Sequence, residues 1–349
     1  MNSIGKHFIL TTFGESHGAA VGGVIDGCPS NIRLDMDMIE ADLKRRATAK
    51  TGFASQRNET DKVKFLSGLK DGVTLGTPIA FMVENVDAQP DSYKELEHVF
   101  RPSHADFTYQ AKYGIRDYRG GGRASARTTL PIVVAGAIAK QILSSKGIAV
   151  QAYTKQIGTV ALDGPTRYYG GQAVLDSEVY CPDKEVTSRM LALIAATAVE
   201  GDTLGGVVGC CIHNMPAGIG EPMFDKMQAR LAHAMLSIPS AKGFEYGDGF
   251  CMASMKGSEA NDVFVSENGK IRTATNHSGG IQGGITNGED VVFNVAFKPI
   301  PSIRQVQKTV TDEGAETNIN IVGRHDVCAV PRAVVIVEAL AAMVAADLI

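Results

Sequence analysis

The sequence predicts a single domain of the α+β class, extending over residues 1–349. Segments with the two-residue alternation of strands and segments with the spacing of helices are both present, but they do not alternate regularly as in a parallel sheet. No linker or low-complexity segment divides the chain, which is long enough to bury a large core. Candidate site segments are spread from residue 14 to residue 326, and one site assembled from the whole length implies one domain.

The composition is that of an ordinary globular protein. Hydrophobic residues make up 44% and charged residues 21%, and the formal net charge is −4, so no general affinity for nucleic acid is expected. The six cysteines contain no C-x-x-C pair and the N-terminal segment has no apolar run of signal-peptide length, which favours a reducing, cytoplasmic location. No segment approaches the ~20 apolar residues of a membrane-spanning helix.

Signals in the first part of the chain predict strands and one helix. The turn at residues 14–18, GESHG, presents Ser16 and His17 between two strands, where a functional histidine and a turn-capping histidine are both possible interpretations. Asp35 is expected to cap a helix that ends near Arg46 with basic residues in its last turn. Strands are expected at residues 8–12, 20–25, 63–69 and 77–85.

The second part is expected to combine apolar helices, strands and two glycine-rich loops. Pro331 can occupy the first turn of a buried final helix, which Arg332 and two carboxylates interrupt. Residues 205–216 loosely repeat residues 22–29, and a true repeat would give the fold two similar halves. Helices are expected at 130–146, 183–200 and 221–236, strands at 148–160, 205–216 and 291–297, and loops at 242–250 and 276–288.

Residues 101–127 concentrate the chemically useful groups. They include five arginines, His104 and three consecutive glycines at 120–122. Arginine forks bind phosphate or carboxylate oxygens in bidentate fashion, and glycines let backbone N–H groups approach an anion. The pattern predicts an anion site with a titratable group beside it, and a solvated basic loop is the alternative.

Several common site motifs are missing from the chain. There is no G-x-x-x-x-G-K-[ST] and no G-x-G-x-x-G after a first strand, which argues against P-loop and Rossmann nucleotide sites. The eight histidines form no H-E-x-x-H pair and the cysteines have no zinc spacing, so no bound transition metal is expected. The G-x-S-x-G elbow of many hydrolases is also missing.

Eight short motifs occur in a recognisable order along the chain. They are GESHG at 14–18, HADFTYQAKYG at 104–114, DYRGGGRASAR at 117–127, GDTLGG at 201–206, GEPMFDK at 220–226, SGGIQGG at 278–284, KPIPSI at 298–303 and GRHD at 323–326. Together they resemble the chorismate synthase family. The match runs from about Gly5 into the final helix, and the combination is far more specific than any single motif.

The resemblance implies a fold, a reaction and a cofactor. The implied fold is a β-α-β sandwich, with helices packed between antiparallel sheets, assembled as a homotetramer. The implied enzyme is a lyase that converts 5-enolpyruvylshikimate 3-phosphate to chorismate and phosphate by an anti 1,4-elimination, the last step of the shikimate pathway towards aromatic amino acids. The family requires reduced FMN although the reaction has no net redox change. Because no second domain is available for NAD(P)H, an external flavin reductase is expected.

The family's functional residues carry over to matching positions of this sequence. The resemblance implies substrate contacts from Arg45, Arg46, Arg101, Arg127 and Arg324. It implies catalytic roles for His17, His104, Asp326, Ser16 and Ser125. It implies flavin contacts from Arg123, Ala124, Ser125, Gly283, Lys298, Pro299, Ile300, Pro301, Ser302 and Arg324. Among these, His17 is expected near the leaving phosphate, and His104 and Asp326 are expected to serve proton transfer at the flavin.

A few positions depart from the family pattern. Ser103 stands where the family usually has glycine, Thr128 where it has glutamate and Val327 where it has proline. The polar residues 47–58 are expected to form a loop, and Gly52 in that loop aligns with a further substrate arginine of the family.

Two other functions share part of this pattern. A flavin-dependent phospho-lyase or phosphate-binding transferase acting on another substrate would need the same arginines and flavin loops. A binding protein could use residues 118–123 as an RGG-like RNA contact, although the acidic net charge and the single short run argue against it.

Overall fold

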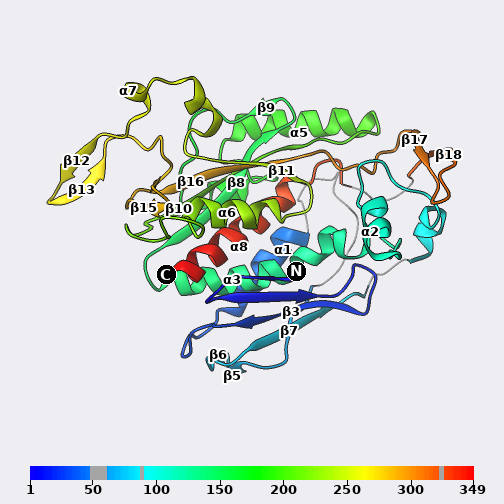
Figure 1. Ribbon diagram of the computed structural model, residues 1–349, viewed down its shortest axis with the longest axis horizontal. Coiled ribbons are helices and arrows are strands. Elements are labelled where there is room, and N and C mark those ends of the chain that lie inside the picture. Colours follow the sequence, from blue (N-terminus) through cyan, green and yellow to red (C-terminus); the bar gives the residue numbers. More distant parts are fainter. Residues whose placement is uncertain (48–60, 87–89, 322–325) are drawn as a thin grey trace.

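Two antiparallel five-stranded sheets enclose a layer of helices (Figure 1). The computed structural model describes residues 1–47, 61–86, 90–321 and 326–349. The first sheet contains, in spatial order, β1 (Ser3–Ile4), β2 (Ile9–Phe13), β3 (Ala20–Asp26), β7 (Ile79–Glu84) and β4 (Lys64–Phe65). The second contains β11 (Ala241–Tyr246), β16 (Val291–Phe297), β10 (Gly206–His213), β8 (Ala149–Ile157) and β9 (Val160–Ala161).

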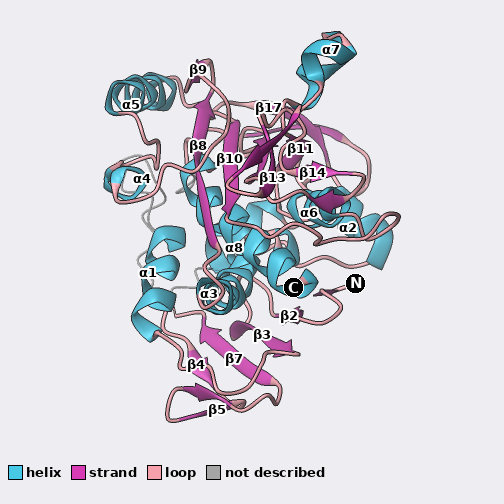
Figure 2. Cartoon of the chain, turned by 90° about the vertical axis from the view of Figure 1, so that its left-hand side faces the viewer, coloured by secondary structure: helices cyan, strands magenta, loops and turns pink. Residues whose placement is uncertain are grey.

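The helix layer is built around α8 (Val330–Leu348). This helix packs against α3 (Leu130–Ser144), α1 (Met36–Ala47) and α6 (Met227–Leu236), and it also contacts β8 and β10. In Figure 2, α3 and α8 lie between the first sheet below and the second above, with α5 (Lys184–Val199) beside β9. The architecture confirms the predicted α+β class, with helices packed between antiparallel sheets.

Smaller elements extend from this sandwich. The short helices are α2 (Asp106–Tyr113), α4 (Ala173–Asp176) and α7 (Gly257–Ala260). The two-stranded hairpins pair β5 (Leu69–Lys70) with β6 (Val73–Thr74), β12 (Phe264–Glu267) with β13 (Lys270–Thr273), β14 (Ile281–Gln282) with β15 (Ile285–Thr286), and β17 (Gln307–Val310) with β18 (Glu316–Ile319). Figure 1 shows the β12–β13 hairpin at one end of the molecule and α2, β17 and β18 at the other.

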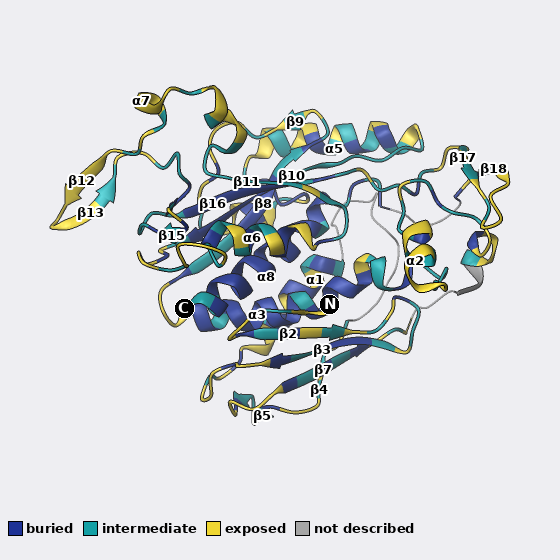
Figure 3. Ribbon diagram, viewed as in Figure 1, coloured by how far each residue is buried: buried dark blue, intermediate teal, exposed yellow. Residues whose placement is uncertain are grey.

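The core is densest where α3 crosses α8. Sixteen of the 19 residues of α8 are buried, and Figure 3 shows the same for most of α3. At the crossing, a Cβ added to Gly136 would lie 2.2 Å from the Cβ of Ala339. Because no real Cβ pair is that close, the backbones approach to a distance that only glycine at position 136 allows.

The carboxylate of Glu338 is buried in the middle of α8. It accepts from Arg45 Nη1 at 2.7 Å and Nη2 at 3.1 Å, from Lys140 Nζ at 2.7 Å, and from the backbone N–H of Ala152 at 3.1 Å. Burial opposes ionisation, but the charges of Arg45 and Lys140 outweigh it and hold the pKa of Glu338 well below its usual value. The network joins α1, α3, β8 and α8.

A second carboxylate of α8, Asp347, fixes the N-terminal segment. Its Oδ1 accepts the backbone N–H groups of Lys6, His7 and Phe8 at 2.7, 2.6 and 2.8 Å, and its Oδ2 pairs with Arg230 of α6. Burial raises its pKa, but these three backbone hydrogen bonds and the charge of Arg230 lower it by more. The two carboxylates that interrupt the apolar final helix are therefore both paired.

Most predicted elements are confirmed, and their caps explain where they begin. Asp35 accepts from the backbone N–H of Met38 at 3.1 Å and so caps α1 as predicted. Pro331 occupies the first turn of α8. The two segments that suggested a repeat contain β3 and β10, and each is the central strand of its five-stranded sheet.

Three predicted boundaries are wrong. The strand expected at 63–69 is divided, because Gly68 has a φ of +82° and separates β4 from β5. Residues 242–250 were expected to form a loop, but most of them belong to β11, which pairs antiparallel with β16 through backbone hydrogen bonds. The helix expected from residue 221 begins only at Met227. No described helix is both long enough and apolar enough to span a bilayer.

Candidate active site

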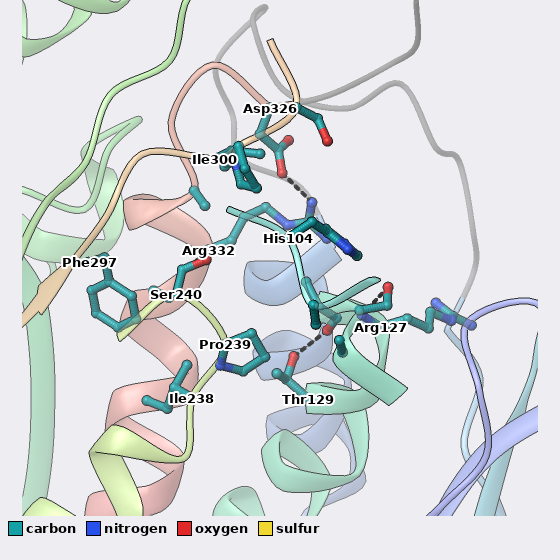
Figure 4. A pocket seen from close by; sticks show the side chains of 18 of the residues that line it. His104, Arg127, Thr129, Ile238, Pro239, Ser240, Phe297, Ile300, Asp326 and Arg332 are labelled. Carbon is teal, nitrogen blue, oxygen red and sulfur yellow. Dashed lines mark hydrogen bonds and ion pairs between the residues drawn. The ribbon is translucent and has the colours of Figure 1, made fainter. Parts of the chain in front are cut away.

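A cavity of about 580 Å³ opens between the ends of the central helices. It is lined from the C-terminal end of α1, the 3-10 turns that precede α3, the loop after α6, the turn after β16 and the first turns of α8. Figure 4 shows Ile238, Pro239 and Phe297 on one side, and His104 and Arg127 on the other. One wall is therefore apolar and the opposite wall is polar.

Positive charge dominates the polar wall. The cationic side chains that line the cavity are Arg46, Arg101, Arg123, Arg127, Lys298 and Arg332. The lining contains two carboxylates, Asp61 and Asp326. Among the described lining residues, cations therefore outnumber carboxylates three to one. In a partly enclosed, low-dielectric space, this excess attracts small anions with several charges.

Asp61 holds two of these arginines. Its carboxylate accepts from Arg46 Nη2 at 2.8 Å and from Arg127 Nη1 at 2.6 Å, and all three side chains are almost fully buried. Burial opposes ionisation of Asp61, but the arginine charges lower its pKa overall. Burial, with the nearby charge of Arg332, lowers the pKa of Arg46 to about 10 even though Asp61 acts in the opposite direction.

Arg46 keeps a donor for a further contact, whereas Arg127 is held firmly in place. Arg46 Nε is buried and has no hydrogen-bond partner among the described residues. Arg127 also donates from Nε to Asn85 Oδ1 at 2.8 Å and from Nη2 to the carbonyl of Glu84 at 3.2 Å. The first sheet, which carries Glu84, therefore fixes the direction of Arg127.

Arg332 and Asp326 meet at the start of α8. Arg332 Nη1 donates to Asp326 Oδ2 at 2.6 Å, and Arg332 Nε donates to the carbonyl of Arg46 at 3.0 Å (Figure 4). The guanidinium therefore connects the last turn of α1 with the carboxylate in front of α8. A bidentate fork suits this bridging position better than a lysine would.

His104 is held from behind by Asp106. The ring Nδ1 lies 2.9 Å from Asp106 Oδ1, and the same carboxylate accepts from Arg101 Nε and Nη2, each at 2.8 Å. Arg101 and His104 both line the cavity, whereas Asp106 lies behind them and is 3% exposed. Burial opposes ionisation, but the hydrogen bonds from Arg101 and His104 hold the pKa of Asp106 well below its usual value.

The glycines at 120–122 pass between two histidines. All three have positive φ, and a Cβ on Gly120 would lie 2.4 Å from His17 Cε1. His17 Nδ1 lies 3.0 Å from Ser16 Oγ, and the His17 ring packs edge-on against Tyr93 at 5.1 Å between centroids. Gly120 and Tyr93 line the cavity, so His17 and the buried Ser16 lie directly behind its wall.

The predicted flavin segments also reach the cavity. Lys298 Nζ donates to the carbonyl of Ser103 at 2.6 Å, and burial together with the charge of Lys242 lowers the Lys298 pKa. Arg123 donates to Thr12 Oγ1 at 2.7 Å and to the carbonyl of Gly14 at 3.1 Å. The other predicted flavin residues in the lining are Ala124, Ser125, Ile300, Pro301 and Ser302.

These residues fit a flat anionic cofactor. The apolar wall suits an aromatic ring system, and the cations suit a phosphate. Ser125 Oγ accepts the backbone N–H of Arg127 at 3.3 Å, and its hydroxyl proton is left for another acceptor. The described residues contain no group of three or more His, Cys, Asp or Glu side chains able to hold a metal ion.

Some predicted site residues lie elsewhere. Arg45 is engaged by Glu338 and by Asp42 at 3.0 Å, outside the cavity lining. Gly283 forms the turn between β14 and β15, with open space where a side chain would be, and it does not line the cavity. Pro299 is also outside the lining. Arg324 and the loop around Gly52 fall outside the described residues.

Other cavity residues carry no signal as site residues in the sequence. Asp61 and Tyr93 lie in segments without a motif, and Ile238 and Pro239 follow a helix that reads as core. Arg332 had a signal, because an arginine in the most apolar helix must be paired or must face a cavity. The prediction treated Arg332 only as an interruption of that helix.

The fold and the cavity define an enzyme for a small, multiply charged anion, with a carboxylate-held histidine beside the binding space. Known proteins identify its class. The chorismate synthase family matches residues 8–349, nearly the whole chain. A chorismate synthase of Porphyromonas gingivalis is 53% identical over 349 residues, covering 99% of this chain and 95% of the relative. One of Phocaeicola vulgatus is 51% identical over 346 residues, covering 99% and 97%.

A solved structure supports the same assignment. A chorismate synthase crystal structure is similar with a TM-score of 0.79 and 30% sequence identity, and the alignment covers 99% of this chain and 92% of that one. The chain is a carbon–oxygen lyase. It belongs to the chorismate synthase family, whose reaction is the elimination of phosphate from 5-enolpyruvylshikimate 3-phosphate to give chorismate.

Proposed function

We propose that the cavity between α1, α3 and α8 performs this 1,4-elimination with reduced FMN as its cofactor. One observation carries the proposal: six cationic side chains and a carboxylate-held histidine line a single cavity whose opposite wall is apolar. The substrate has one phosphate and two carboxylates, so it needs several arginine forks at once. The flavin, when bound, supplies transient electron density to the reacting system.

Arg46, Arg101 and Arg127 are proposed to bind the anionic groups of the substrate. Each is buried and lines the cavity, and an ionic hydrogen bond made from such a partly desolvated site is stronger than one made in open water. Arg324 is proposed for the same role from its motif alone. Arg45 is proposed to act through its ion pairs with Asp42 and Glu338, which fix the end of α1 that carries Arg46.

His104, His17 and Asp326 are proposed to handle protons and the leaving group. His104 lines the cavity, where it can hydrogen-bond or protonate the flavin. His17 lies behind Gly120, which lines the cavity, and it is proposed to act on the leaving phosphate from that side. Asp326 is proposed to assist proton transfer at flavin N5. Ser16 supports His17 as its hydrogen-bond partner, and Ser125, which accepts the backbone N–H of Arg127, is proposed to hydrogen-bond a bound molecule.

The flavin is proposed to lie along the apolar wall. Lys298 and Arg123 supply positive charge for its phosphate or its reduced ring, and residues 300–302 and 124–125 supply close packing. Pro299, Gly283 and Arg324 remain proposed flavin contacts on the strength of their motifs. We further propose a cytoplasmic homotetramer that receives reduced flavin from an external reductase, without nucleic-acid or membrane partners.

An anaerobic assay tests the proposed function. Enzyme, 5-enolpyruvylshikimate 3-phosphate and photoreduced FMN should release phosphate and form chorismate, whereas oxidised FMN with NADPH should give no product unless a reductase is added. Absence of phosphate release with photoreduced FMN would contradict the elimination. Turnover with NADPH and oxidised FMN alone would contradict the need for an external reductase.

Histidine variants test the assigned residues. His104→Ala and His17→Ala should each reduce turnover by about 10² or more, because a positioned proton-transfer group contributes about that factor, and should weaken FMN binding less. FMN affinity can be measured by fluorescence quenching under anaerobic conditions. Wild-type turnover in both variants would reject their assigned roles.

A further inference from the structure

The position of Asp106 suggests a role that none of the motif-based assignments gives it. Asp106 is the first residue of α2, where a carboxylate commonly caps the helix or offsets its dipole. Its side chain, however, makes no capping hydrogen bond to α2, and the residue at the cap position is Ala105. The hydrogen bonds of the Asp106 carboxylate go instead to Arg101 and His104.

The two oxygens of this carboxylate hold different groups. Oδ2 accepts from the backbone N–H of Arg101 at 3.0 Å and from Arg101 Nε at 2.8 Å. Oδ1 accepts from Arg101 Nη2 at 2.8 Å and faces His104 Nδ1 at 2.9 Å. Arg116 Nη1 lies 3.5 Å from the same oxygen. One buried carboxylate therefore sets the orientation of two cavity-lining side chains.

The charge state of Asp106 decides which nitrogen of His104 carries the proton. Three donors from Arg101 hold the carboxylate ionised, so it can only accept at His104 Nδ1. Nδ1 must then be the protonated nitrogen. Nε2 has no hydrogen-bond partner among the described residues. It lies beside Gly121, and a Cβ added to that glycine would be 3.0 Å from Nε2. Nε2 is therefore the nitrogen left for a bound molecule.

We propose that Asp106 is a positioning residue, which fixes His104 as the Nδ1–H tautomer and Arg101 in a single rotamer. Nε2 of His104 then exchanges protons with the cavity, and the Arg101 fork meets an anionic group of the substrate in a fixed direction. The inference rests on the proposed function, because it assumes that His104 takes part in proton transfer. It adds a separate claim about the tautomer, which can be measured without any activity.

The tautomer can be observed directly in the unmodified enzyme. Magic-angle-spinning NMR of 15N-histidine-labelled protein distinguishes a protonated Nδ1 from a protonated Nε2, and a His104→Gln spectrum assigns the resonance. We expect wild-type His104 to carry its proton on Nδ1, and Asp106→Asn to give a mixture of tautomers or Nε2–H. A wild-type His104 with the proton on Nε2 alone would overturn the proposal without any variant at position 106.

Kinetics separates positioning from a purely structural role. In folded Asp106→Asn enzyme, kcat should fall about 10²-fold through the lost tautomer. The KM for the substrate should rise about tenfold or more through the loosened Arg101. In a His104→Gln background, Asp106→Asn should lower kcat no further but should still raise KM. An equal fall in kcat in both backgrounds would overturn the positioning of His104.

Two further variants serve as controls. Asp312→Asn removes the carboxylate from a surface pair of the same kind, His98 Nδ1 to Asp312 Oδ2 at 2.9 Å, and should leave kcat, KM and the His104 resonance unchanged. Asp106→Glu keeps the charge and should recover part of kcat, and it replaces Asp106→Asn if that variant does not fold. If His104→Gln is slow but Asp106→Asn has the kinetics of the unmodified enzyme, the positioning role of Asp106 alone is overturned. Wild-type turnover in His104→Gln overturns the proposed function of His104 and the use of its tautomer together.

Discussion

Gly121 lies directly against His104: a Cβ at position 121 would be 2.8 Å from His104 Cε1, and Gly121 has a φ of +92°. Two features therefore require glycine at position 121: the left-handed backbone conformation and the lack of space for a Cβ beside the His104 ring. This explains the glycine run better than contact with an anion, which the sequence alone suggested.

Gly121→Ala is expected to impair the enzyme in both respects. The new methyl must displace the His104 ring, so turnover should fall by about 10²-fold, the cost of an ångström-scale misplacement. The left-handed backbone should add a loss of about 1–3 kcal/mol in the free energy of unfolding. Anaerobic turnover and urea unfolding measure the two effects.

Gly114→Ala is the matched control for this variant. Gly114 also has positive φ, +73°, but an added Cβ would meet nothing within 4 Å. It should show a comparable loss of stability without the loss of turnover. If Gly114→Ala lost as much turnover as Gly121→Ala, the ring contact would not be the cause.

Arg332→Gln is expected to lower turnover about tenfold to a hundredfold, because Asp326 loses the guanidinium that orients it. Arg332→Lys should recover little, since an ammonium cannot bridge Asp326 and the Arg46 carbonyl as the planar fork does. Steady-state kinetics with photoreduced FMN provides the measurement. Full activity in Arg332→Lys would show that only the charge matters.

Glu338→Gln is expected to destabilise the fold strongly. It leaves Asp42 as the one carboxylate that the described residues offer to both Arg45 and Lys140, and breaking a buried ion pair costs about 3–5 kcal/mol. Asp312→Asn removes a carboxylate from an exposed pair with His98 and should change the free energy of unfolding by less than about 1 kcal/mol. Equal costs, measured by urea unfolding, would contradict the buried network.

Ser103→Gly is expected to stabilise the protein. Ser103 has a φ of +57°, a left-handed conformation that costs a side-chain-bearing residue about 1 kcal/mol or more and glycine little. Ser145, at φ −63°, is the control, where glycine should destabilise by about 0.5–1 kcal/mol. The urea midpoint should rise for Ser103→Gly and fall for Ser145→Gly. A lower midpoint for Ser103→Gly would contradict backbone strain at Ser103.

Asp347 is expected to contribute to acid sensitivity. Its pKa is lowered in the folded protein from an ordinary 3.8, so its stabilisation is complete above about pH 4 and is lost as the pH falls through the lower, folded value. The free energy of unfolding of Asp347→Asn should therefore fall less steeply below pH 4 than that of the unmodified protein. Identical slopes, measured by urea unfolding between about pH 2 and pH 6, would rule out this contribution.

The sequence predicted those parts of the fold that depend on local rules. Asp35 and Pro331 mark helix starts because capping and the first helical turn are local requirements. β11 was missed because its glycines favour loops, and only pairing with β16, about 50 residues later, makes it a strand. Local propensity cannot anticipate a partner that distant.

The site, like the fold, was predicted only where short local motifs carry the information. Motifs singled out Arg101, His104 and Arg127, and all three line one cavity. Arg116, another arginine of the same stretch, has structural contacts, because its Nη2 donates to the carbonyls of Leu96, Glu97 and Val99. Asp61 could not be foreseen, because it becomes a site residue only when the fold brings Arg46 and Arg127 together around it.

The place of α8 in the chain bears on how the protein is made. This helix lies between the sheets and pairs with α1, α3 and β8 through Glu338, yet it follows both sheets in order of synthesis. Until the ribosome has released residue 348, the helix layer lacks its central member, and Arg45 and Lys140 have no counter-charge from α8. The nascent chain must therefore remain incompletely packed for most of its translation, a period in which chaperone binding competes with aggregation.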